Sequence, residues 1–149
     1  MTKKLDEWFG ITTYAVFKSI YDQFGEGGYS IIRTMGKYIY RELEERVDLD
    51  TGDPKEAVRR MTAYAKDLGY ISELEIAWGE RSIELKYTST AALGPIEKLT
   101  AEKCKILPCF FTSAVVEALR KRGVNTEISE STVDPESDTD TDILRIIKV

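Results

Sequence analysis

The sequence predicts an α+β domain in which a helical layer packs on an antiparallel β-sheet. Three stretches in the first half carry apolar residues at helical spacing, and residues 74–87 alternate apolar with polar side chains. A further helix-like stretch is then followed by two strand-like ones. This grouping, with expected order ααα-ββ-α-ββ, is typical of an α+β fold and not of a regular strand–helix alternation.

Two helices are expected before residue 50, with a glycine-rich turn between them. The first spans about Thr12 to Phe24 and the second about Tyr29 to Arg46, because large apolar side chains recur every three or four residues. The cluster Gly25–Gly28 lacks the Gly-Lys-Ser/Thr ending of a phosphate-binding loop and predicts a turn. Gly36 lowers the stability of the second helix by up to about 1 kcal/mol relative to Ala, which indicates close approach of another backbone or a ligand.

A third helix has a clear start at Asp53-Pro54, where an N-cap aspartate precedes a proline at the first helical position, and it ends at Gly69. The acidic segment Asp134–Asp140 is expected to form a solvated turn. The other elements are a hairpin with Leu74, Ile76 and Trp78 facing Ile83, Leu85 and Tyr87, a connector over 91–103 with room for a short helical turn, a helix over about 108–122, and strands over 124–133 and 143–149.

The composition is that of a soluble globular chain, and 149 residues favour a single domain, 1–149. No apolar run approaches the roughly 20 residues of a membrane span, and no signal-peptide core follows the N-terminus. Two cysteines without such a signal indicate a reducing compartment, so we expect a cytoplasmic protein. The net charge of −5 argues against nucleic-acid binding, and the basic run 120–122 is explained by the end of a helix.

The absence of histidine narrows the chemistry. It excludes Ser-His-Asp and Cys-His catalysis and a haem held by a proximal histidine. Cys104 and Cys109 make up half of a zinc site at most, and the acidic groups, Asp138, Asp140 and Asp142 among them, are expected in solvated positions. No catalytic constellation emerges, and we expect no cofactor and no metal.

Cys109 allows two interpretations. At the start of a helix, unpaired backbone N–H groups favour a thiolate, and Phe110 and Phe111 would place two rings beside it. Free cysteine is also among the most buried residue types, and a buried thiol at the start of a core helix is the interpretation we favour.

The glycine-containing segment Tyr29–Leu43 resembles the second helix of the 4-vinyl reductase domain family, often labelled hydrocarbon-binding protein in prokaryotes. The hairpin with Trp78 and Tyr87 and the late helix Pro108–Leu119 are similar to that family in placement. The resemblance begins near residue 29 and leaves 1–28 as an N-terminal helical extension. The family shares its fold with haem NO-binding domains and with the small core subunits of the TRAPP tethering complex.

The resemblance implies an α+β fold, dimerisation through the helical layer and an internal cavity for an apolar ligand. Three properties of the related proteins do not carry over to this chain. Metal binding would need cysteines that residues 125–149 lack, and haem binding would need a histidine that the chain lacks. Acylation would need a cysteine in an early helix, whereas both cysteines of this chain come late. We therefore expect a homodimeric sensor or carrier, and not an enzyme, that binds a small apolar ligand and signals through a protein partner. The candidate lining residues are Met35, Ile39, Tyr64, Trp78, Cys109 and Phe110.

Two alternatives remain open at this point. The first is an enzyme or enzyme subunit acting on a tetrapyrrole-like substrate, with Cys109 as its reactive group. The second is a pure protein-assembly module whose core is filled and whose helical face makes the contacts.

Overall fold

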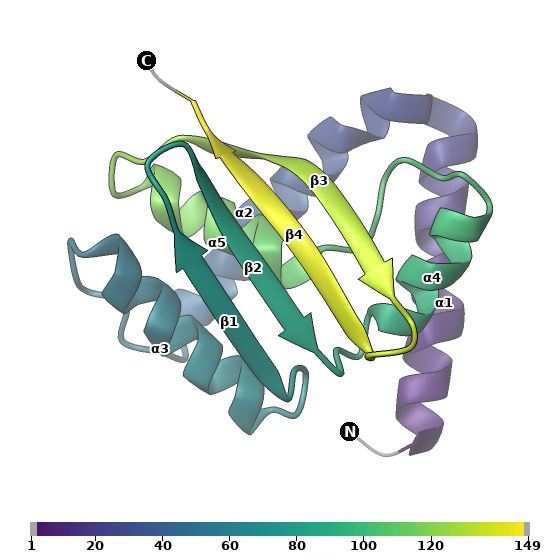
Figure 1. Ribbon diagram of the computed structural model, residues 1–149, viewed down its shortest axis with the longest axis horizontal. Coiled ribbons are helices and arrows are strands. Elements are labelled where there is room, and N and C mark those ends of the chain that lie inside the picture. The colour runs from purple at the N-terminus through teal and green to yellow at the C-terminus, as the bar shows by residue number, and fades with distance from the viewer. Residues whose placement is uncertain (1–2, 148–149) are drawn as a thin grey trace.

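Four strands form one antiparallel sheet in the computed structural model, which describes residues 3–147. They are β1 (Glu73–Trp78), β2 (Ser82–Thr88), β3 (Thr126–Asp134) and β4 (Thr139–Ile146), in the spatial order β1-β2-β4-β3. Ile83, Leu85 and Tyr87 alternate with exposed residues along β2, so one face of the sheet is buried. All the helices lie on that side, and the opposite face points away from them (Figure 1).

The described helices are α1 (Lys3–Phe24), α2 (Tyr29–Glu44), α3 (Pro54–Asp67), α4 (Leu93–Ala101) and α5 (Phe110–Arg120), and a 3-10 turn at Gly25–Gly28 joins the first two. The helix start predicted at Asp53 is confirmed, since its carboxylate accepts a hydrogen bond from the Lys55 N–H at 3.1 Å. The α+β fold and the antiparallel sheet are confirmed as well.

Helix α5 occupies the centre of the molecule, between the sheet and α2. Most of its residues are buried, and the main core lies between α2, α3, α5 and the sheet, around Tyr40, Met61, Leu85, Leu119 and Leu144. The close approach predicted at Gly36 is confirmed: a Cβ at this position would lie 2.5 Å from the Ser113 carbonyl oxygen of α5. The lack of a side chain therefore sets the spacing between α2 and α5.

A second, smaller core attaches α1 to the rest of the chain. Phe17 of α1 packs there with Ile32, Leu99, Cys104 and Ile106, which come from α2, α4 and the segment that leads to α5. Phe17 and Phe110 meet edge to face with ring centroids 5.4 Å apart. The helices α1 and α4 consequently lie side by side at one end of the sheet (Figure 1).

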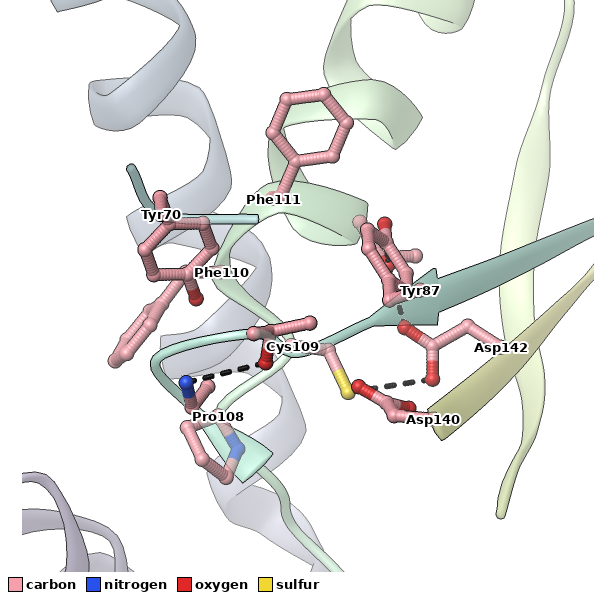
Figure 2. A pocket seen from close by; sticks show the side chains of 11 residues that line it. Tyr70, Tyr87, Pro108, Cys109, Phe110, Phe111, Asp140 and Asp142 are labelled. Atoms are coloured by element: carbon pink, nitrogen blue, oxygen red, sulfur yellow. Dashed lines mark hydrogen bonds between the residues drawn. The ribbon is translucent and has the colours of Figure 1, made fainter. Parts of the chain in front are cut away.

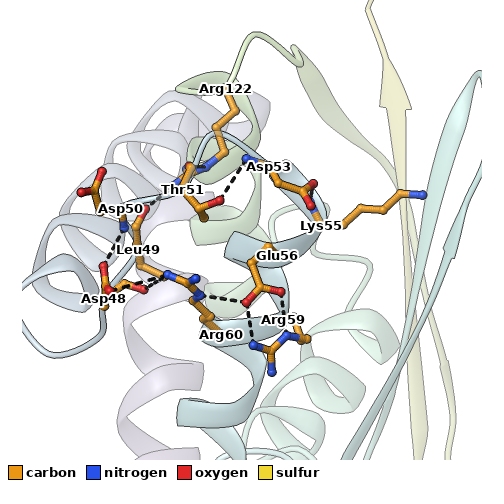
Figure 3. A network of polar contacts seen from close by, with 10 residues as sticks. All are labelled: Asp48, Leu49, Asp50, Thr51, Asp53, Lys55, Glu56, Arg59, Arg60 and Arg122. Carbon is orange, nitrogen blue, oxygen red and sulfur yellow. Dashed lines mark hydrogen bonds and ion pairs between the residues drawn. The ribbon is translucent and has the colours of Figure 1, made fainter.

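The loop between α2 and α3 is tied down by Arg122, at the end of α5 (Figure 3). Its guanidinium donates to the Leu49 carbonyl at 2.6 Å, to the Thr51 carbonyl at 2.8 Å and to the Ala118 carbonyl at 2.9 Å. The last of these is a contact to the C-terminal turn of α5, as expected for a cation at a helix end. The basic run at 120–122 thus serves the fold, with Arg120 paired to Glu117.

The largest differences from the sequence prediction are in α1, α4 and β4, and the remaining bounds shift by one or two residues. Helix α1 begins at Lys3 and not near Thr12, because the buried Thr13 interrupts the apolar stripe by which the helix was recognised. The connector over 91–103 contains a full helix, α4, of nine residues. Strand β4 begins at Thr139 and not at Ile143, so part of the expected turn is strand; the last two residues of the expected strand, 148–149, lie outside the described residues.

Over residues 3–147, no helix has both the length and the apolar character that crossing a membrane requires.

The substitution Gly36→Ala is expected to lower the free energy of unfolding by about 1–3 kcal/mol, because the new methyl group meets backbone of α5 that cannot rotate away. Urea unfolding measures this change. Gly94→Ala in α4 is the matched control, since nothing lies within 4 Å of a Cβ there, and its effect should stay within about 0.5 kcal/mol. Equal losses in both variants would contradict the role given to Gly36.

Candidate functional site

Strand β4 carries a buried pair of carboxyl groups. Asp140 and Asp142 alternate with Thr139 and Thr141, so both aspartates point toward the helices, and they are only 4 % and 1 % exposed. The prediction that they lie in a solvated turn is therefore wrong. The alternation that continues backward from Leu144 was the signal for this, but four polar residues in a row favoured a turn.

Asp142 is the centre of a buried polar network (Figure 2). Its carboxylate accepts hydrogen bonds from the Thr112 hydroxyl at 2.5 Å and the Ser131 hydroxyl at 2.6 Å, and the Cys109 thiol donates to it at 3.6 Å. The Tyr87 hydroxyl lies 2.6 Å from that of Thr112. The network joins β2, β3, β4 and the first turn of α5.

The electrostatics of this network keep protons on its members. Burial, followed by the neighbouring charge of Asp142, raises the pKa of Asp140 to about 8, and the Asp140 Oδ1 atom has no hydrogen-bond partner among the described residues. Burial also raises the pKa of Asp142, although hydrogen bonds from Ser131, Thr112 and Cys109 oppose this. Within residues 3–147, no cationic side chain lowers the pKa of either carboxyl group, so no ion pair offsets the burial.

Cys109 occupies the N-cap position of α5 but does not behave as an activated thiol. Burial, and after it the charges of Asp142 and Asp140, raises the pKa of this thiol well above its usual range. Burial, together with the neighbouring acids, outweighs the effect of the helix N-terminus, so the thiolate interpretation is not supported and the buried-thiol interpretation is confirmed. Both thiols are free, and that of Cys104 donates to the Ile106 carbonyl at 3.2 Å.

The cavity at this network is very small. Its volume is about 10 Å³, and its wall includes Tyr70, Tyr87, Cys109, Phe110, Asp140 and Asp142. About one water-sized sphere fits such a space. The network is therefore a structural feature of the core and not a binding site for an organic ligand.

A much larger hollow lies between α2, α5 and the edge strand β3, and we call it the α2–β3 groove. Its volume is about 590 Å³, within the usual range of ligand sites. An adjoining hollow of about 420 Å³ extends along β3 toward the segment before α5. The two share Tyr29, Ile32, Ile128 and Ser129, so they form one elongated depression.

The wall of the α2–β3 groove combines apolar side chains with a few polar groups. Ile32, Val116 and Ile128 supply apolar surface. Ser113 and Thr126 are 6 % and 8 % exposed, and their hydroxyl oxygens are buried without a hydrogen-bond partner among the described residues. An unsatisfied buried hydroxyl costs about 1–3 kcal/mol. Because both oxygens are fully buried, they belong to the packing behind the groove wall, and a ligand in the groove does not reach them. Sequence reasoning did not identify either one.

The six predicted lining residues do not converge on one hollow. Cys109 and Phe110 border the small cavity, and Cys109 also borders the depression along β3. Trp78 borders a separate shallow hollow between α3 and β1, under the Lys55 ammonium at 5.6 Å from the ring centroid. Met35 packs on the second core and Ile39 on the main core, and Tyr64 is half-buried on α3. Their role in ligand binding stays a prediction.

This architecture recurs in solved structures. An H-NOX protein from S. oneidensis in the Fe(II)NO ligation state aligns with a TM-score of 0.52 and 15 % identity, over 91 % of this chain and 74 % of that one. The unliganded Fe(II) H-NOX protein from K. algicida aligns with a TM-score of 0.39 and 11 % identity, over 97 % of this chain and 64 % of that one. The first alignment defines the chain as an α+β domain of H-NOX-like fold.

Residues 10–138 match the model of the family described as "Putative rubredoxin C-terminal domain", and the chain belongs to this family. No curated protein matches the chain. The family found is not the 4-vinyl reductase family named by the resemblance, whereas the link to the haem NO-binding fold is supported.

The donor set of this chain does not fit the iron groups that these names suggest. A haem needs an axial ligand, most often histidine, which the chain lacks. The Cys109 thiol is held protonated beside two carboxyl groups, and the cavity next to it takes one water. An iron site of four thiolates needs more than two cysteines, and residues 3–147 bring together no cluster of Cys, Asp and Glu that could hold a metal.

Stability is expected to fall as the pH rises from near 4 to about 8. Folded Asp140 binds its proton more tightly than the unfolded chain does, so its contribution is complete below the unfolded pKa and is lost as the pH passes its folded pKa of about 8. Asp140→Asn should flatten this dependence and raise the free energy of unfolding at pH 8 by about 1–3 kcal/mol. Denaturant unfolding at several pH values measures it, with the exposed Asp50→Asn as control. Identical pH profiles for Asp140→Asn and the unsubstituted protein would refute the assignment.

The Cys109 thiol is expected to resist alkylation in the folded protein at pH 8, because it is both buried and protonated. In a Cys104→Ala background, iodoacetamide should label it at least about 100-fold more slowly than in the urea-unfolded chain. Mass spectrometry of timed samples gives both rates. Labelling as fast as that of the unfolded chain would restore the reactive-thiol interpretation.

Proposed function

We propose that this domain binds a small molecule in the α2–β3 groove and acts as a sensor or carrier module. The observation that carries the proposal is the groove itself: it has the volume of a ligand site, and its wall combines apolar side chains with a few charged ones. The H-NOX-like fold supports it, because the solved relative was captured in an Fe(II)NO ligation state, with a small ligand bound.

The groove also supplies a route from binding to signalling. Its walls come mainly from three elements, α2, α5 and β3, and the Tyr29 hydroxyl at the start of α2 donates to the Lys105 carbonyl at 2.9 Å. A ligand that contacts all three elements favours the arrangement in which it fits best, and so shifts their relative populations. A protein partner that contacts the same helices would read this shift.

The alternative of an enzyme acting through Cys109 is less well supported. A nucleophilic cysteine needs a lowered pKa and access to its substrate, whereas this thiol has a raised pKa and borders a cavity of about 10 Å³.

Binding in the groove is tested by native mass spectrometry of freshly purified protein and by titration with an apolar probe, dodecan-1-ol. Val116→Trp fills the groove and should lower probe affinity at least about tenfold. Ala63→Trp, which fills the hollow beside Trp78, is the control and should leave the affinity unchanged. Loss of binding in Ala63→Trp alone would move the site to Trp78, and absence of probe binding to the unsubstituted protein would remove the proposal.

Self-association is a second candidate function, favoured by the apolar surface of α1. Trp8, Ile11 and Val16 are 64 %, 55 % and 51 % exposed along this helix, more than isolated surface apolar residues require. A homodimer through the helical layer would cover them.

If α1 forms the dimer contact, Trp8→Glu should weaken dimerisation roughly tenfold or more, because a large aromatic residue is replaced by a charge at the centre of the contact. Analytical ultracentrifugation over a range of concentrations measures the dissociation constant. Leu68→Glu, at an equally exposed apolar residue after α3, is the control. A monomer at all concentrations would exclude this candidate.

A further inference from the structure

Two arginines line the α2–β3 groove, and they differ in whether they make an ion pair. Arg145 lies at its rim and is paired with Glu127 of the neighbouring strand, so the two cancel. Arg33 of α2 also lines the groove, and it makes no ion pair among residues 3–147. One guanidinium is therefore available in the part of the depression nearer the start of β3.

The remainder of the depression is long, and its wall combines an apolar strip with Lys103, Lys105 and Glu130. From Arg33, its wall continues over Ile32 and Ile128 to Leu107, through the hollow that adjoins the groove along β3. Ser113 and Thr126 also line the part of the wall near Arg33, but their hydroxyl oxygens are fully buried. A cation at one end that is unpaired among the described residues, with an apolar strip leading away from it, matches a molecule that has a head and a tail.

We infer that the ligand is a single-chain amphiphile with an anionic head group, such as a carboxylate with an unbranched acyl tail. Arg33 pairs with the head group, and the tail lies along Ile32, Ile128 and Leu107. This assignment rests on the proposed function and adds the chemical class of the ligand. A charge-assisted hydrogen bond of this kind changes affinity by about tenfold or more.

The test compares dodecanoate with dodecan-1-ol, which share a tail and differ in the head group, at concentrations where both are monomeric. Isothermal titration calorimetry should show dodecanoate binding at least about tenfold more tightly. Arg33→Gln should remove this preference without changing the affinity for dodecan-1-ol. Arg59→Gln on α3 is the matched control and should keep it, because Glu56 there retains its ion pair with Arg60 (Figure 3).

The outcomes separate the two proposals. Equal binding of both probes, lost in Val116→Trp, would overturn the anionic class and leave the binding module standing. Binding of neither probe would overturn both. A preference for dodecanoate that survives Arg33→Gln would overturn the role of Arg33, and binding to phosphatidylglycerol vesicles without binding of monomeric dodecanoate would replace the free amphiphile with a membrane surface.

Discussion

The contact between Gly36 of α2 and the backbone of Ser113 in α5 is the constraint on which the other features depend. Because no side chain separates them there, the two helices pack closely and α5 is held against the sheet. The first turn of α5 then brings Thr112 to Asp142, and its end brings Arg122 to the loop before α3. The same contact places Ser113 in the wall of the groove, so the position of the site follows from helix packing.

Asp140 and Asp142 are two carboxyl groups buried in the core. Removing a carboxylate from water without a cation is costly, and the favourable response is to retain a proton. Asp142 lowers this cost with three donors, from β3, from α5 and from its N-cap, whereas Asp140 leaves an oxygen unpaired among the described residues. A proton on Asp140 removes a buried charge beside this network, so the stability of this part of the core depends on pH.

The sequence predicted the elements that have strong local signals and missed those that tertiary contacts determine. The helix start at Asp53, the hairpin and the close contact at Gly36 each follow from residue types with few structural options. The donors that satisfy buried Asp142 come from Ser131 and Thr112 on distant elements, and no local pattern contains that information. The groove also has no local sequence signal, since its wall comes from four separate elements, α2, α5, β3 and β4.

A shared fold and a shared chemistry are separate matters in this domain. The H-NOX-like fold positions α5 over the sheet, but a buried thiol at the start of that helix faces two acids of β4, and this set does not fit an iron group. The filled core beneath them leaves about 10 Å³, whereas the rim between α2 and β3 leaves about 590 Å³. If a small molecule acts on this fold, it therefore acts at the rim, where α2 borders both the groove and the core.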